Sequence, residues 1–408
     1  MTQKSTAEIL PLTSLRFFLA TWVVLFHLDV TSWSAIQAKN SGDSPLLNLI
    51  FCAYVAVNVF FVLSGFILAL NYPLDKPWTS NERRKFAIAR FSRIYPVYVL
   101  AVAAIAPLIL GTAIATHAKA ILLRHGISGV MNLLMIQAWF PQTAISWNGP
   151  GWSLSCEAFF YISFALAGGY FFNIKSLGGT ILALLGLWLA ALVAPALSIF
   201  AHVPGYSDAV ATDQPSSLFA WFVGFNPLLN LPLFLSGIVA CRCLLIVKQT
   251  GKLAGKGYLL YVPSFAVLLA LTCLGNHIPY PLMHNGLTLP ASSGIVVGLA
   301  LGDRYLCALL TNRILVFLGK ASYAEYLLHF PVRTAFDWFH VSWSPFFQVL
   351  YLATVLAVSA IVFHFYEEPL QRKLRGLLTM QRPAGGVKAP MAGAARVAAV
   401  DGLPHGRK

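Results

Sequence analysis

Residues 48–71 read NLIFCAYVAVNVFFVLSGFILALN and contain no charged side chain. A helix needs about 20 consecutive apolar residues to cross a bilayer, so this stretch is long enough to span a membrane. Comparable apolar stretches recur along the chain. Together they predict an all-α, polytopic membrane protein with about ten spans, at about 17–38, 48–71, 94–116, 150–172, 178–200, 218–241, 257–275, 287–303, 321–340 and 344–366.

The composition requires lipid as the solvent. Of 408 residues, 58% are hydrophobic and only 10% are charged, whereas soluble domains carry about 25% charged residues. The stretch 128–141 is too short to span and is interpreted as an interfacial or re-entrant piece. The first span has no A-x-A cleavage site and is interpreted as an uncleaved anchor. The six cysteines lie mostly within apolar runs and are expected to be packing residues rather than disulfides.

The lysines and arginines set the predicted orientation. With the N-terminus in the cytoplasm and ten spans, all of the 28 lysines and arginines except Lys39, Lys119, Arg124 and Arg333 fall in cytoplasmic segments. Such a bias is typical of cytoplasmic loops, so both termini are predicted to be cytoplasmic. The net charge of +14 is therefore interpreted as a topology signal. It favours anionic membrane lipids, rather than nucleic acid, as partners.

Three segments make up the predicted domain organisation. Residues 1–11 form a cytoplasmic N-terminal segment, and residues 12–372 form the transmembrane domain. Residues 373–408 are basic and rich in Ala, Gly and Pro, which predicts a disordered cytoplasmic tail.

Arg16 and His27 are the first candidate pair of functional residues. Eleven residues at 100° each make three turns plus about 20°, so both side chains lie on one helix face, separated by a rise of about 16 Å. Arg16 is expected at the cytoplasmic edge and His27 near the middle of the membrane. An anionic ligand held at Arg16 would then extend a thin tail to His27. The competing interpretation is a histidine satisfied inside the helix bundle.

Other ionisable residues within spans are costly and are therefore candidates for function. Glu157 follows a Gly-Pro-Gly turn and is expected about one and a half turns below the outer surface, where it must pair or be protonated. Glu325, His329 and Arg333 step by four residues along one face, and such a ladder can satisfy itself through i,i+4 contacts. A structural ion pair or hydrogen bond remains the alternative for each.

Arg90 and Arg93 lie three residues apart at the base of the third predicted span. Two guanidinium groups on one helix face form a suitable clamp for phosphate. Beside Arg16, they are expected to form a basic mouth on the cytoplasmic side. The neighbouring Arg83, Arg84 and Lys85 are interpreted as an ordinary cytoplasmic charge cluster.

Six short motifs in order resemble the acyltransferase 3 family of membrane-bound acyltransferases, across about residues 10–372. They are Leu12-Thr13-Ser14-Leu15-Arg16 running to His27, Asn58 to Phe66, Arg90-Phe91-Ser92-Arg93-Ile94-Tyr95-Pro96, Trp152 to Glu157, Ser322-Tyr323 with Tyr326 to His329, and Tyr366-Glu367-Glu368-Pro369. The chain departs from the family's pattern at two positions. Ala158 stands where many relatives carry a second glutamate, and Glu325 stands at a commonly apolar place.

The resemblance implies transfer of an acyl group, with acetyl the expected one, from cytoplasmic acyl-CoA to a hydroxyl group of a carbohydrate or glycolipid in a bacterial inner membrane. Arg16, Arg90 and Arg93 would hold the phosphates of acetyl-CoA. His27 would act as general base, or as a covalent acyl carrier, and Glu157 would orient the acceptor or polarise a proton path. Expected substrate-binding residues are Trp152, Ser155, Tyr161 and His329. No metal is expected, because the histidines lack ligand spacing.

Two other classes of function remain open at this point. A proton-coupled transporter or a flippase of lipid-linked glycans would use buried His and Glu side chains as proton relays, although no inverted repeat is visible in the sequence. A receptor or scaffold without catalysis would leave His27 dispensable. Consumption of acyl-CoA by membranes distinguishes these classes from an acyltransferase.

Overall fold

A computed structural model describes residues 8–28, 44–72, 74–115, 119–207, 210, 217–251, 253–341 and 343–379. Within these ranges every extended regular element is helical, and one isolated bridge pairs Val210 with Pro279. The predicted all-α class is confirmed. The helices are α1 (Leu10–Phe26), α3 (Pro45–Phe51), α4 (Val55–Asn71), α5 (Ser80–Ala115), α6 (Lys119–Leu133), α7 (Trp152–Phe172), α8 (Leu177–Phe200), α9 (Leu218–Phe225), α10 (Pro227–Thr250), α11 (Tyr258–Cys273), α12 (Tyr280–His284), α13 (Leu289–Leu301), α14 (Leu306–Leu310), α15 (Arg313–Trp338), α16 (Pro345–Val362) and α17 (Glu368–Thr379).

Several of these helices are long and apolar enough to cross a membrane. Among the described residues six stretches qualify, namely Pro45–Asn71, Ser80–Ala115, Gly149–Phe172, Leu177–Phe200, Leu218–Thr250 and Pro345–Leu378. Two shorter apolar helices, α1 and α11, accompany them, and α13 and α15 overlap the two remaining predicted spans. The chain is thus a multi-pass membrane protein, while the count of ten spans stays a prediction.

Hydrogen bonds join helix ends that the predicted topology puts on the same side of the membrane. At one end they connect Ser14 to Leu310, Asn173 to Leu74, and Gly257 to Gly302. At the other end they connect Trp22 to Leu49 and Asn48 to Cys273. These bonds put the last turns of α1 beside the start of α3, and the start of α11 beside the end of α13, as the sequence-based topology does.

Helix α1 differs from the predicted first span, 17–38. The helix begins at Leu10 and ends at Phe26, and residues 29–38 of the predicted span lie outside the described residues. Hydropathy placed the start of the span after Arg16, because an arginine is unfavourable in lipid. In the structure Arg16 lies six residues inside α1, about 9 Å from the start of the helix, and its position at the cytoplasmic edge stays a prediction. Its side chain faces a cavity rather than lipid.

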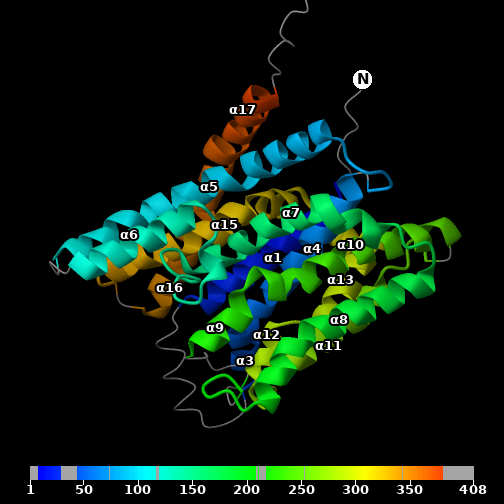
Figure 1. The fold of residues 1–408 in the computed structure, drawn as a ribbon, viewed down its shortest axis with the longest axis horizontal. Coiled ribbons are helices and arrows are strands. Elements are labelled where there is room, and N and C mark those ends of the chain that lie inside the picture. The colour runs from blue at the N-terminus through cyan, green and yellow to red at the C-terminus, as the bar shows by residue number, and fades with distance from the viewer. Residues whose placement is uncertain are drawn as a thin grey trace, which may run out of the picture.

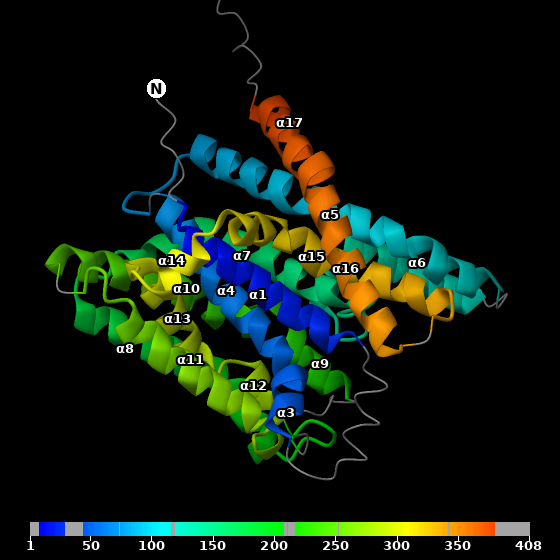
Figure 2. The same ribbon diagram turned by 180° about the vertical axis from the view of Figure 1, so that it is seen from behind.

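Two helices extend well beyond their predicted spans. Helix α5 begins at Ser80, so the basic segment around Arg83 and Arg90 is helical rather than a loop. Helix α17 continues from α16 to Thr379, past the predicted start of the tail at 373. Figures 1 and 2 show α17 projecting from the bundle and crossing the N-terminal part of α5. The predicted short segment 128–141 overlaps the end of α6, which packs against α5.

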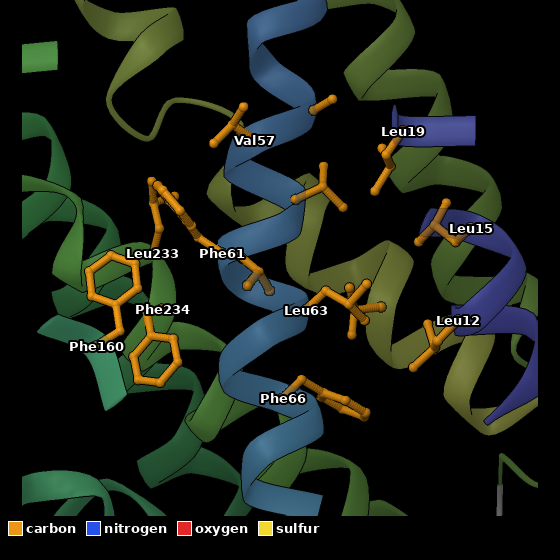
Figure 3. Packing of buried hydrophobic residues seen from close by; sticks show 14 of the residues in the cluster. Leu12, Leu15, Leu19, Val57, Phe61, Leu63, Phe66, Phe160, Leu233 and Phe234 are labelled. Carbon is orange, nitrogen blue, oxygen red and sulfur yellow. The ribbon is translucent and has the colours of Figure 1, made fainter. Parts of the chain in front are cut away.

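Helix α4 lies in the middle of the buried core. Its apolar residues contact leucines of α1 on one side and phenylalanines of α7 and α10 on the other (Figure 3). Helix α10 approaches α4 very closely, because a Cβ atom at Gly237 would lie 2.0 Å from the carbonyl oxygen of Val62. Small residues at helix contacts are the usual means of close packing in membranes. All six cysteines, which lie within the described ranges, are free, as expected.

Candidate active site

A cavity of about 300 Å³ lies between α1, α4, α5, α7 and α15. Its walls include Ile9 at the start of α1 and Asn71 at the end of α4, so it lies on the side of the bundle where α1 begins. At the far end the walls include Val57 near the start of α4. Fourteen residues separate Val57 from Asn71, and a rise of 1.5 Å per residue makes the cavity about 21 Å long. The cavity is therefore elongated along the bundle.

The two ends of the cavity differ in chemistry. Toward Asn71 the walls carry the guanidinium groups of Arg16, Arg90 and Arg93. Toward Val57 they are mostly apolar and aromatic, and they end at Ser153 and Tyr326. The structure thus brings together the three arginines that the sequence predicted as a basic mouth, at the end of the cavity that the predicted topology puts in the cytoplasm.

The three arginines are held in different ways. Arg90 donates a hydrogen bond to the hydroxyl group of Tyr72 at 3.2 Å and lies 5.5 Å from the centre of that ring. Arg93 forms an ion pair with Glu367 and lies 5.5 Å from the centre of the Tyr323 ring. Arg16 forms no hydrogen bond or close ion pair with any side chain that the structure describes. A cation in a cavity of low polarity favours an anionic ligand, and Arg16 is free to bind one.

Glu157 lines the same cavity as the arginines. Its carboxylate accepts a hydrogen bond from the hydroxyl group of Tyr161 at 2.7 Å. Of the four predicted substrate-binding residues, Tyr161 lines the cavity and the other three do not. Glu157 therefore has the partner that a carboxylate at this depth requires, and this partner is on its own helix.

Trp152 and Ser155 are buried in the packing between helices. The ring of Trp152 meets the ring of Phe61 edge to face at 5.8 Å, and the Ser155 hydroxyl oxygen accepts a hydrogen bond from the backbone of Ala138 at 3.4 Å. Neither residue lines the cavity. A role for Trp152 in stacking on a sugar therefore has no support from the geometry.

His27 lies outside the cavity, at the C-terminal end of α1. Its Nδ1 atom is 2.9 Å from the carbonyl oxygen of Val23, and its ring centroid is 5.0 Å from that of His329. Arg16 and His27 share a face of α1 as predicted, but Ala20 and Val23 between them are buried and packed. The predicted continuous path for a ligand along α1 is thus closed in this structure.

The predicted ladder of Glu325, His329 and Arg333 does not satisfy itself. Its side chains turn to α1 instead. Thr21 donates a hydrogen bond to Glu325 at 2.8 Å, and Arg333 donates to the carbonyl oxygen of His27. His329 has only a 3.3 Å contact from Nδ1 to the backbone oxygen of Glu325. Glu325 and Arg333 therefore fasten α15 to α1 around His27, while Arg333 also pairs with Asp337 on its own helix at 3.4 Å.

Three functional contacts were not predicted from the sequence. They are the Glu367–Arg93 ion pair, the Tyr72–Arg90 hydrogen bond, and a 2.9 Å hydrogen bond between Ser153 and Tyr326 at the closed end of the cavity. Glu367 and Tyr326 belong to two of the six motifs that resemble the acyltransferase 3 family. Membership of these motifs is the signal in the sequence that marks the two residues as candidates. Among the described residues, no group of three or more His, Cys, Asp or Glu side chains is arranged to hold a metal ion.

Comparison with known proteins agrees with the motif analysis. A family model described as an acyltransferase domain matches residues 11–364. Acyltransferase MdmB of Streptomyces mycarofaciens is 30% identical over 329 residues, which cover 79% of this chain and 78% of that protein. Protein 2 in picA locus of Rhizobium radiobacter is 46% identical over 54 residues, 13% of this chain and 28% of its own length. No solved structure matches the chain.

Proposed function

The chain belongs to the acyltransferase 3 family, and from this membership we propose that it transfers an acyl group from cytoplasmic acyl-CoA to a hydroxyl group of a carbohydrate or glycolipid acceptor. Acetyl is the acyl group and acetyl-CoA the donor that we propose first. The acceptor reaches the reaction centre from the outer side of a bacterial inner membrane. The protein thereby passes an acyl group across the bilayer while CoA stays in the cytoplasm.

The observation that carries this proposal is the gathering of Arg16, Arg90 and Arg93 in one elongated cavity. Acyl-CoA combines several phosphates with a long, thin arm. Guanidinium groups bind phosphate through paired hydrogen bonds, and among the described residues Arg16 has no hydrogen-bonded partner that a ligand would displace. The narrow apolar part of the cavity, toward Val57 and Phe60, suits the arm. The alternative, a proton-coupled transporter or a flippase of lipid-linked glycans, is distinguished by whether membranes that contain the protein consume acyl-CoA.

In the proposed reaction the acceptor oxygen attacks the thioester carbonyl carbon. Its proton passes to His27 as a new C–O bond forms, and the C–S bond then breaks. The thiolate of CoA leaves and takes up the proton from His27, which restores the base. An unperturbed histidine has a pKa of about 6.5, which suits a general base near neutral pH. In the alternative route the acyl group is first carried on the His27 ring and then passed to the acceptor.

The closed end of the cavity adds a requirement to this mechanism. Ser153 and Tyr326 close the cavity, and the ring centroid of Tyr326 is 6.2 Å from that of His329, which in turn packs on His27. The thioester therefore reaches His27 only after a local opening near Tyr326. We include this opening in the proposal, as a conformational step between donor binding and transfer.

The test is transfer of label from acetyl-CoA to saccharide by membranes that contain the native chain or His27→Ala at matched levels. A crude glycan extract of the host supplies the acceptor. His202→Ala is a suitable control, because His202 is an exposed histidine just after α8, a helix that does not line the cavity. Transfer by the native chain and the control, with loss in His27→Ala, is expected. Equal transfer by all three contradicts the role of His27, and absence of any acyl-CoA consumption favours the transporter class.

A further inference from the structure

Glu367 is a buried carboxylate that the mechanism above leaves unused. It belongs to the motif Tyr366-Glu367-Glu368-Pro369 and is 1% exposed. It lies at the end of a π-helical segment, Phe363–Glu367, that joins α16 to α17. Such segments occur as short interruptions of α-helices and are frequent at functional sites. The next residue, Glu368, is an ordinary surface group, with its side chain 41% exposed and paired with Arg372.

The π-helical segment is fastened to α5 by two consecutive side chains. Glu367 forms an ion pair with Arg93, and Tyr366 donates a hydrogen bond to the carbonyl oxygen of Pro96 at 3.3 Å. Arg93 and Pro96 lie almost one turn apart on α5. The contact therefore fixes the π-helical segment beside the part of α5 that carries the cavity arginines.

Arg93 is held on two sides and open on a third. Its guanidinium lies between the carboxylate of Glu367 and the ring of Tyr323, and its side chain remains 20% exposed and lines the cavity. A free arginine side chain loses about 2 kcal/mol of rotamer entropy when it is fixed. Holding the group in place beforehand removes this cost from ligand binding.

Glu367 itself does not line the cavity, and its carboxylate pairs directly with Arg93, so its effect on a ligand is expected to pass mainly through Arg93. We propose that Glu367 is a positioning residue of the donor site, which orients the Arg93 guanidinium to bind a phosphate group of the acyl-CoA. This inference rests on the proposed function, since it states how one arginine of the proposed donor site is prepared.

The ion pair between Glu367 and Arg93 can also be interpreted as an obstacle to donor binding. A carboxylate next to a phosphate-binding arginine can compete with the phosphate, and its removal would then strengthen donor binding. The position of Glu367 behind Arg93 and outside the cavity favours positioning. The two interpretations predict changes of opposite sign in the dissociation constant, which makes them separable.

The experiment is calorimetric titration of CoA into the detergent-purified full-length protein. Glu367→Gln keeps the size of the side chain and removes its charge, and Glu368→Gln makes the same change one residue away on the surface. We expect Glu367→Gln to raise the Kd about tenfold, equivalent to about 1.4 kcal/mol, and Glu368→Gln to leave it unchanged. An unchanged or lower Kd in Glu367→Gln overturns the inference. Failure of the native protein to bind CoA overturns the proposed function instead.

A double-mutant comparison tests whether Glu367 acts through Arg93. In an Arg93→Met background, Glu367→Gln is expected to cause no further rise in the Kd. A further tenfold rise in that background shows an independent role and overturns the inference. Glu367→Asp, which keeps the charge and shortens the reach, is expected to give an intermediate Kd and covers the case in which Glu367→Gln does not fold.

Discussion

The contact between α1 and α15 predicts a specific effect of Gly319→Ala. These helices pack so closely that a Cβ atom at Gly319 would lie 2.0 Å from the carbonyl oxygen of Thr13, whereas ordinary contacts begin at 3.4 Å. The nearest atoms belong to the backbone of Thr13 and cannot rotate away, so the helices must move apart by about 1.4 Å. Overpacking of this kind costs about 1–3 kcal/mol of stability. We therefore expect Gly319→Ala to lower the unfolding temperature.

The same displacement reaches the donor site. Thr13 lines the cavity on α1, and Ser322 and Tyr323, three and four residues after Gly319, line it on α15. Tyr323 also supports Arg93. A misplacement of about 1 Å can reduce catalysis about a hundredfold, so we expect weaker CoA binding and slower transfer as well as lower stability.

Gly111→Ala is the matched control for this prediction. Gly111 also lies within a helix, but a Cβ atom there would have no neighbour within 4 Å. Alanine at such a helical position is expected to be neutral or to stabilise by about 0.5–1 kcal/mol. The measurement is thermal unfolding in detergent, followed by intrinsic fluorescence, together with the Kd for CoA. Equal unfolding temperatures and equal Kd values for the two variants would refute the reasoning.

Three further predictions concern Tyr72, Phe60 and His27. Tyr72→Phe removes the hydrogen bond to Arg90, so the KM for acetyl-CoA is expected to rise several-fold with kcat little changed, and a fall in kcat alone would contradict this. Phe60→Ala widens the narrow end, so the ratio of kcat/KM for butyryl-CoA to that for acetyl-CoA is expected to rise about tenfold, and an unaltered ratio would show that Phe60 does not limit acyl length. The rate of transfer is expected to rise with pH to a plateau, because His27 must be unprotonated to accept a proton. A rate that does not change between about pH 5 and pH 8 would contradict this role of His27.

The parts of the fold and site that were predicted correctly depend on neighbours in sequence. Long apolar runs show the helices, and the spacing of Arg90 and Arg93 puts both on one face of a helix. The shared face of Arg16 and His27 follows in the same way. These features need only helix geometry, and the structure brings all three arginines to one cavity.

The parts that were missed depend on contacts between distant segments. Glu367 and Arg93 are 274 residues apart, and Ser153 and Tyr326 are 173 residues apart. Helical periodicity gives no information about such pairs. Helix α1 begins before the predicted first span for a related reason. Hydropathy treats Arg16 as a residue that must avoid the membrane, and it contains no information on the cavity that Arg16 lines. The closure between the cavity and His27 likewise depends on packing against α15.

The central claim is that Arg16 and its neighbours hold the phosphates of the donor. The most direct test compares acetyl-CoA with S-acetyl-N-acetylcysteamine, a thioester donor without phosphates, for the native chain and Arg16→Met. We predict that the native chain has a far higher kcat/KM for acetyl-CoA, and that Arg16→Met loses most of this preference while it keeps its activity with the phosphate-free donor. An undiminished preference for acetyl-CoA in Arg16→Met would contradict the account.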